Sequence, residues 1–341
     1  MKPISNGTAR GLFRIGCLVL VGMAASAKPL PRYHFTEIPI AFPRAINDSG
    51  EVVGSDAVPL VYRDGAVSTI VPWSGAATAI NAVGEIILFA IPQGANQPSA
   101  FVWAGGSAHL LPAGSLPSRA AGINDAGLIV GGAGAEGQPA VAVLWSNYCC
   151  YRILGTLRDG YSSHAFDINN LDQAVGSSWP TTFVIGTLPR TRAVLFQQGR
   201  VEDLGLPQNG IAGTAVAIND RSQIVVNCSV VFGASGRPQA FLYSDGLFTN
   251  LGTLPGFFST QATDINNAGQ IVGGSNTGGA DHAFFYADGQ MYDLNDLTHV
   301  PKGWVLAGAN GINNRGEIVG VALVDGAIRG FLLTPRGNNR R

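Results

Sequence analysis

Charged residues are scarce in this chain, and no stretch gathers Lys and Arg into a basic stripe. Asp, Glu, Lys and Arg together make up only 13% of the 341 residues, and the formal net charge is −1. A protein that binds nucleic acid neutralises phosphates with a basic face, so we expect no nucleic-acid partner. Beyond the N-terminal segment, no apolar run approaches the length that crosses a bilayer.

Long amphipathic helices are the next absence. Apolar residues cluster instead in short β-branched runs bounded by Gly, Asn, Asp and Pro, a pattern typical of strands joined by turns. The chain also contains 46 Gly and 19 Pro, which suits many turns. The sequence therefore predicts an all-β protein, and its length is enough for one large all-β domain.

Recognisable catalytic and metal-binding motifs are lacking as well. No histidine belongs to a His-x-x-x-His or His-Glu pair with the spacing of a metal site. There is no Gly-x-Ser-x-Gly element, and no glycine-rich loop precedes a helix. We therefore assign no catalytic residue, no metal site and no cofactor. The five histidines are His34, His109, His164, His282 and His299.

The N-terminal segment has the three parts of a secretory signal peptide. Lys2, Arg10 and Arg14 form a positive region, residues 15–25 are apolar, and small residues end the segment at Ala27. We expect cleavage after Ala27, so that residues 1–27 are removed. The expected location is the periplasm or the extracellular space.

Three cysteines remain after that cleavage: Cys149, Cys150 and Cys228. An odd number in an exported protein is not a disulfide framework. Cys149 and Cys150 could form a vicinal disulfide, one of them could pair with Cys228, or all three could be free thiols. The sequence leaves these alternatives open.

One phrase, Ile-Asn-x-x-Gly-x-Ile-Val-Gly, recurs along the rest of the chain with some substitutions. Successive copies are 34, 43, 45, 50, 47 and 47 residues apart, which is the size of a β-propeller blade. Seven copies predict seven structural repeats. Their turn asparagines are Asn47, Asn81, Asn124, Asn169, Asn219, Asn266 and Asn313.

Each repeat contains signals for four antiparallel strands. Asn-x-x-Gly matches a type I turn, in which the Asn side chain bonds the backbone and Gly accepts a left-handed conformation. A strand, a variable loop and an aromatic-rich strand follow, and an Asp-Gly hairpin turn such as Asp64-Gly65 often precedes the fourth strand. Two later repeats have Asp172 and Ser222 in place of the turn Gly.

Four strands per repeat predict a seven-bladed β-propeller that occupies residues 28–335, with 336–341 as a polar tail. An open β-solenoid is the main rival. The seventh repeat lacks a fourth strand, and the unmatched strand-like segment 33–38 precedes the first repeat. We therefore predict that this N-terminal strand closes the ring. The first repeat is the shortest and is expected to be poorly formed; the protein is expected to be a monomer.

The pattern resembles the HAF-repeat family of bacterial exported proteins. His282-Ala283-Phe284 has the tripeptide that names the family in its usual place, and Leu251-Gly252-Thr253-Leu254-Pro255-Gly256 is similar to the link between its repeats. The stretch from Asp293 to Pro335 also looks like its closing repeat. The resemblance implies an exported repeat protein without a defined activity, and it transfers no catalytic residue.

Several turns are faintly similar to calcium loops, among them Asp167-x-Asn169 and Asp264-x-Asn266. Calcium takes about six to eight oxygen ligands, and an EF-type loop ends in a bidentate Glu, which is missing here. We therefore interpret these residues as turn formers.

Aromatic residues on the variable loops are the candidate ligand-binding residues. In a propeller, the loops between strands two and three and the links between blades lie on one face, and both are long and variable here. Aromatic residues on such loops suit sugars, peptides or proteins, although some of them could fill gaps between blades. The candidates are the aromatic residues Trp73, Tyr161, Trp179, Phe257, Phe258 and Trp304, together with Arg158 on the same kind of loop.

The leading functional hypothesis is a non-catalytic binding or scaffold module for a cell-surface glycan or an envelope protein. One alternative is a propeller enzyme, a lyase or glycosidase, with its acids at the central channel. The other is a purely structural repeat protein. Carboxylates with an Arg at the channel mouth would favour the enzyme, and an aromatic face would favour binding.

Overall fold

The structure is a computed structural model that describes residues 31–114, 116–134, 140–159, 161–181, 190–232 and 235–336. The expected signal peptide therefore lies outside the described residues, and the described residues belong to the compact unit that begins at Pro31. No helix among the described residues is both long and apolar enough to cross a membrane.

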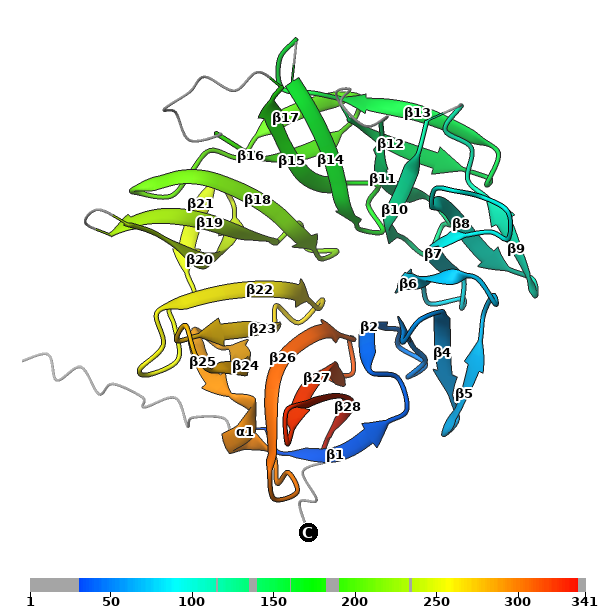
Figure 1. The fold of residues 1–341 in the computed structure, drawn as a ribbon. Helices are drawn as coiled ribbons and strands as arrows, with labels where there is room; N and C mark the ends of the chain where they lie inside the picture. Colours follow the sequence, from blue (N-terminus) through cyan, green and yellow to red (C-terminus); the bar gives the residue numbers. More distant parts are fainter. Residues whose placement is uncertain are drawn as a thin grey trace, which may run out of the picture. The chain divides into compact units, whose positions relative to one another are not determined.

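Seven four-stranded antiparallel sheets form the blades of a propeller, as the repeats predicted (Figure 1). Blades 1 to 4 are β2–β5 (Phe42–Ile46, Val52–Ser55, Pro59–Arg63, Ala66–Thr69), β6–β9 (Ser74–Ile80, Ile86–Ile91, Ser99–Ala104, Ser107–Leu110), β10–β13 (Ser118–Ile123, Ile129–Ala133, Val141–Ser146, Cys150–Gly155) and β14–β17 (Tyr161–Ile168, Ala174–Pro180, Arg192–Gln197, Arg200–Asp203). Blades 5 to 7 are β18–β21 (Gly210–Ile218, Ile224–Phe232, Ser235–Ser244, Leu247–Asn250), β22–β25 (Ser259–Ile265, Ile271–Asn276, Asp281–Ala287, Gln290–Asp293) and β26–β28 (Trp304–Ile312, Ile318–Val324, Ala327–Pro335) with β1 (Tyr33–Ile38). A short helix, α1 (Leu294–Leu297), links blades 6 and 7.

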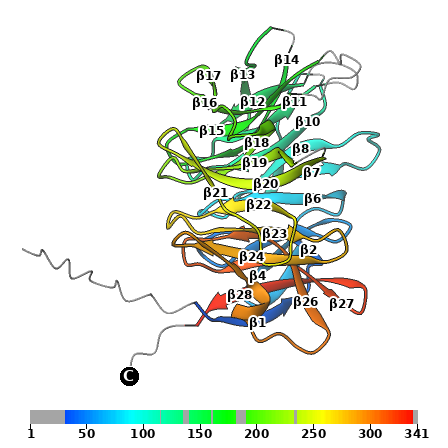
Figure 2. The same cartoon turned by 90° about the vertical axis from the view of Figure 1, so that its left-hand side faces the viewer.

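The N-terminal strand closes the ring. β1 pairs antiparallel with β28, from Tyr33 opposite Pro335 to Ile38 opposite Gly330, and so becomes the outermost strand of blade 7. The two strands lie side by side in both views of the ring (Figures 1 and 2). The prediction of this closure from the unmatched segment is confirmed.

Blade 1 is complete, so the expectation that the shortest repeat would be poorly formed is wrong. Its four strands pair in sequence order, and the predicted Asp64-Gly65 turn joins the last two. Both residues have positive φ, 51° and 84°, as a two-residue hairpin requires. The repeat is short mainly because its connections are short, and its strands, of 5, 4, 5 and 4 residues, are short as well.

Hydrophobic cores lie between neighbouring blades. One of them joins Ile87 and Val102 of blade 2 to Ile129 and Trp145 of blade 3. Trp145 is fully buried, and its Nε1 donates a hydrogen bond to the carbonyl oxygen of Pro112 at 2.6 Å. A single blade could not bury both of its faces, so each blade depends on its neighbours.

Candidate functional site

The inner strands β2, β6, β10, β14, β18, β22 and β26 surround the central channel (Figure 1). Each inner strand ends in one of the seven Asn turns, so these turns gather at one end of the channel. The loops between second and third strands and the links between blades lie at the other end. We call these the Asn-turn end and the long-loop end.

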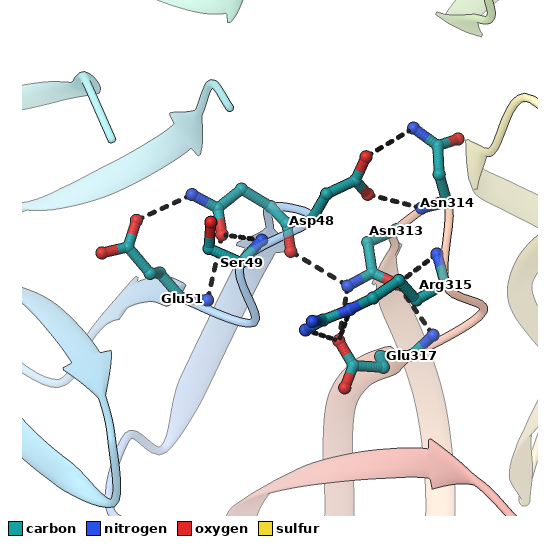
Figure 3. Close-up of polar contacts among 8 residues, drawn as sticks. Asp48, Ser49, Glu51, Asn313, Asn314, Arg315 and Glu317 are labelled. Atoms are coloured by element: carbon teal, nitrogen blue, oxygen red, sulfur yellow. Dashed lines mark hydrogen bonds and ion pairs between the residues drawn. The ribbon is translucent and has the colours of Figure 1, made fainter. Parts of the chain in front are cut away.

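At the Asn-turn end, the seven asparagines form one closed ring of hydrogen bonds. Each Nδ2 donates to the backbone carbonyl oxygen of the next blade's Asn, over 2.9–3.1 Å. The bond from Asn313 to Asn47 joins the last blade to the first (Figure 3). All seven are buried. The Asn residues therefore join blades in addition to forming turns.

The residue four positions after each Asn usually completes the turn. In six repeats it is Glu or Gln, and its side-chain oxygen accepts a second bond from the Asn Nδ2. Blade 3 has Leu128 there instead, and Asp172 of blade 4 accepts the bond from Asn124 at 3.1 Å. Asp172 is one of the residues in place of a turn Gly, with φ 59°. Asp172 therefore replaces the acceptor that blade 3 lacks.

A second ring runs beside the first, through the residue after each Asn. Its backbone N–H donates to the side-chain oxygen of the equivalent Asp or Asn in the next blade, as between Asn314 and Asp48 at 2.8 Å (Figure 3). Ala82 leaves one gap in this ring, since it has no side-chain oxygen to accept the bond. Among the described residues no group of three acidic, His or Cys side chains could hold a metal ion.

Two further carboxylates, those of Asp167 and Asp264, also join neighbouring blades. Asp167 accepts 2.8 Å bonds from the N–H groups of Ile168 and, in blade 5, Ile218. Asp264 does the same in blades 6 and 7. Burial raises the pKa of Asp167 to about 7 and that of Asp264 to about 6. These residues resembled calcium loops in sequence, and here they bind backbone.

The loop aromatics predicted as ligand contacts divide into packed and exposed groups. Trp73 packs on Phe101 with ring centres 5.3 Å apart. Trp304 packs edge-on against Phe35, and both rings lie against the core that joins blades 6 and 7. Phe257 lies over His282, also against a core. Filling gaps between blades accounts for these three residues.

The other predicted contacts are more open. Phe258 is 53% exposed, with the Arg237 guanidinium 5.1 Å from its ring centre. Arg158 is exposed, whereas Tyr161 and Trp179 are half-buried at the ends of β14 and β15. The structure does not bring the seven predicted residues together, and none of them lines the two cavities at the long-loop end of the channel.

The larger of these cavities has a volume of about 720 Å³ and was not predicted from the sequence. Inner-strand residues from blades 1 to 5 line it, so it lies in the channel itself. Every inner strand has a β-bulge three residues before its Asn. A bulge re-aims a side chain, and six of the seven bulged residues line the cavities. The bulged residues are Arg44, Thr78, Ala121, Phe166, Val216, Thr263 and Asn310.

One side of the larger cavity is cationic and aromatic. Arg44 and Arg119 are exposed within it, and Arg119 lies over the ring of Phe89 at 4.9 Å. Burial, and then the nearby Arg119 charge, lower the pKa of Arg44. His164 and Phe166 follow on blade 4, with ring centres 4.7 Å apart.

The His164 ring fits into the cavity wall because blade 3 has a glycine beside it. A Cβ on Gly132 would lie 2.4 Å from the Cδ2 atom of His164, so Gly132 leaves the room that the ring occupies. Burial lowers the pKa of His164 to about 4, and its buried Nδ1 has no hydrogen-bond partner in the described part of the chain. The ring is therefore neutral near pH 7.

A second cavity of about 610 Å³ continues around the channel, and Val216 borders both. Neutral polar residues of blades 5 and 6 line it, including Thr214 and Gln261. Cys228 also borders it; burial raises the pKa of this thiol to about 12, so it stays protonated. A protonated thiol is a weak nucleophile.

All three described cysteines are free thiols. Cys149 and Cys150 are exposed at the start of β13, with sulfur atoms 3.1 Å apart. Cys228 is buried in the core between blades 4 and 5. The sequence had left their pairing open, and the structure contains no disulfide between them.

Comparison with known proteins identifies the fold. The β-propeller domain of the Trilobed protease from Pyrococcus furiosus, described as an open velcro topology, matches with a TM-score of 0.59 and 11% identity, over 90% of this chain and 94% of that one. An acylaminoacyl peptidase matches at 0.57 and 12%, over 89% of this chain and 52% of that one. A puromycin-hydrolyzing peptidase of Mycobacterium tuberculosis matches at 0.56 and 12%, over 91% and 52%.

The chain spans about half the length of those two peptidases, and at such identities the likeness concerns the propeller fold alone. No protein-family model matches the chain. No curated protein matches it in sequence. The resemblance to the HAF-repeat family therefore rests on the quoted motifs.

Proposed function

We propose that this chain is an exported, non-catalytic binding module that recognises a glycan at the long-loop end of its channel. The larger cavity carries the proposal. Five blades contribute to its lining, and its volume of about 720 Å³ lies within the range typical of ligand sites. Export is inferred from residues 1–27 and is consistent with the resemblance to an exported repeat family.

The chemistry of the lining favours binding over hydrolysis. Two free carboxyl groups on either side of the scissile bond are what most glycosidases use. The described lining of the larger cavity contains Arg, His, Phe, Thr and small residues, but neither Asp nor Glu. The nearby Asp167 and Asp264 already accept two backbone hydrogen bonds each. We therefore prefer a binding module to a lyase or glycosidase.

A purely structural role is less well supported, because structure alone does not need this cavity. The Asn ring and the cores between blades already hold the propeller together. Aromatic and cationic side chains that face open space in a channel contribute little to stability. They are, however, the side chains on which sugars stack and with which acids pair.

A glycan panel tests the proposal. Purified protein is screened against neutral and acidic polysaccharides, with Phe166→Ala inside the cavity and Phe258→Ala outside it as the matched aromatic control. We expect saturable binding that Phe166→Ala abolishes and Phe258→Ala preserves. If only Phe258→Ala loses glycan binding, the binding site lies on the outer loops instead of in the cavity.

Binding to no glycan would reject the proposal outright. A protein partner from the cell envelope would then be the next hypothesis. A pull-down from envelope extract would test it, with the same two variants to place the contact surface.

A further inference from the structure

The channel is chemically uneven although the repeats are alike. In blades 1 to 6, the residues that line the long-loop cavities include many of those five and three positions before the turn Asn and eight positions after it. In blades 1 to 4 these positions include Arg44, Phe89, Arg119, His164 and Phe166. In blades 5 and 6 they are neutral, mostly polar residues. A ligand in the channel therefore meets a cationic side and a hydrogen-bonding side.

Neither guanidinium on the cationic side forms an ion pair with a carboxylate of the described residues. The ion pairs among the described residues all involve other cations. The surroundings of Arg44 instead include a second positive charge, that of Arg119. Like charges held close together without a counter-charge repel each other. An anion that enters the cavity would relieve this repulsion while it bonds both groups.

The neutral side offers free hydrogen-bonding groups. No hydrogen bond joins the Thr214 hydroxyl or the Gln261 amide to another side chain or backbone group in the described part of the chain, and both line the adjoining cavity. Together they can accept and donate hydrogen bonds. These are the partners that sugar hydroxyls need.

We propose that the channel binds an acidic sugar residue, a hexuronate, with its carboxylate at Arg44 and Arg119 and its hydroxyls toward Thr214 and Gln261. This inference rests on the proposed glycan-binding function and names its ligand class. The planar guanidinium matches a carboxylate through two parallel hydrogen bonds. An acidic peptide would satisfy the cationic side but would supply few hydroxyls for the neutral one.

The test compares acidic oligosaccharides with the same molecules after reduction of the carboxyl groups. Trimers and tetramers of galacturonate, mannuronate and hyaluronan, each with its carboxyl-reduced counterpart, are titrated by calorimetry. The variants are Arg44→Gln and Arg119→Gln. Arg237→Gln is the matched control, because its guanidinium lies over Phe258 outside the cavities.

We expect at least one acidic oligosaccharide to bind at least tenfold more tightly than its reduced form. Each cavity variant should weaken that binding at least tenfold, whereas Arg237→Gln should leave it unchanged. Raising the salt concentration should weaken binding to the wild type more than to either cavity variant. Circular dichroism and urea unfolding confirm that the exposed Arg substitutions leave the fold intact.

Each contrary result has its own meaning. Equal binding of acidic and reduced forms, unaffected by the Arg variants, overturns the hexuronate assignment but leaves glycan binding standing. Poly-glutamate that displaces the oligosaccharide with equal affinity shows an anion site without sugar specificity and also overturns the assignment. Binding to no glycan in either series overturns the assignment and the proposed function together.

Discussion

Replacing Asn266 with Ala should lower the free energy of unfolding by about 2–4 kcal/mol. The side chain is buried and forms four hydrogen bonds. Its Nδ2 donates to the Asn313 carbonyl oxygen at 3.0 Å and to the Gln270 Oε1 at 2.7 Å. Its Oδ1 accepts from the N–H groups of Ala268 and Gln270, both at 3.0 Å.

The magnitude follows from what these bonds contribute. A hydrogen bond contributes about 1 kcal/mol net, so the loss of all four bonds would cost about 4 kcal/mol, the upper end of the expected range. The lower limit applies if water from the channel reaches the freed backbone groups, because the turn borders a cavity of about 200 Å³ at the Asn-turn end. The cost should exceed that of an ordinary turn substitution, since the change also cuts the bond to blade 7.

Urea unfolding followed by tryptophan fluorescence measures the effect. Asn96→Ala is the matched control, because Asn96 is exposed in the loop between β7 and β8. Asn266→Asp keeps both acceptor bonds but places an oxygen where two donors are needed, so it should destabilise about as much as Ala. If Asn266→Ala unfolds at the same urea concentration as Asn96→Ala with an unchanged slope, the ring does not hold the blades as argued.

Three further predictions concern other contacts. Because burial raises the pKa of Asp167 to about 7 and that of Asp264 to about 6, well above the unfolded value, their stabilising contribution is complete below about pH 4 and is lost as the pH rises through 7. The Asp167→Asn, Asp264→Asn double variant should therefore show a flatter dependence of the unfolding free energy on pH between 4.5 and 8 than the wild type; parallel curves would contradict this. Deleting β1 should prevent cooperative unfolding or lower the urea midpoint far more than removing the exposed loop residues 93–97, and equal midpoints would show that the ring does not need this strand. Asp172→Ala should lower the free energy of unfolding of the wild type by about 1 kcal/mol, because it removes the acceptor for the Asn124 side chain. The loss should be clearly smaller in a Leu128→Gln background, where the Gln side chain supplies another acceptor. An equal loss in both backgrounds would contradict the role of Asp172 as a substitute acceptor.

The ring itself was predictable because local signals agree with the global fold. Seven Asn-x-x-Gly-like turns at blade-sized spacing fixed the number of blades. The missing fourth strand after Asn313 predicted the role of β1. The size of the first repeat was misleading, since spacing between turns measures loop length as well as strand length. In blade 1 short connections, together with slightly shorter strands, account for the difference.

The cavity could not be read from any single motif. Its residues are far apart in sequence, from Arg44 to Val216, and are ordinary in their local context. A signal does exist: aligning the repeats on the turn Asn and comparing the positions three and five residues before it reveals Arg44, Arg119, His164 and Phe166. These positions face the channel because of the β-bulge. The bulge is a feature of how the strands pair, and the amino-acid composition gives no sign of it.

The loop aromatics show a different limit of prediction from sequence: the residues were identified, but their packing was not. Trp73 and Phe257 lie on links between blades and Trp304 begins β26, yet their rings pack against cores between blades. An aromatic residue in a loop has the same sequence appearance whether it fills a gap or faces solvent. Only the packing of the next blade decides between the two, and that contact is not local.

The two ends of the channel differ because side chains at the Asn-turn end must bond the next blade, whereas most side chains at the bulge need not. At the Asn-turn end each residue must both donate to one blade and accept within its own turn, so all seven repeats keep Asn. At the bulge, only Thr78, Thr263 and Asn310 have side chains bonded to a neighbouring blade's backbone. Arg44 and Phe166 form no such bond in the described part of the chain. The repeats could therefore diverge at the bulge without opening the ring, and the cavity proposed as the binding site formed where they did.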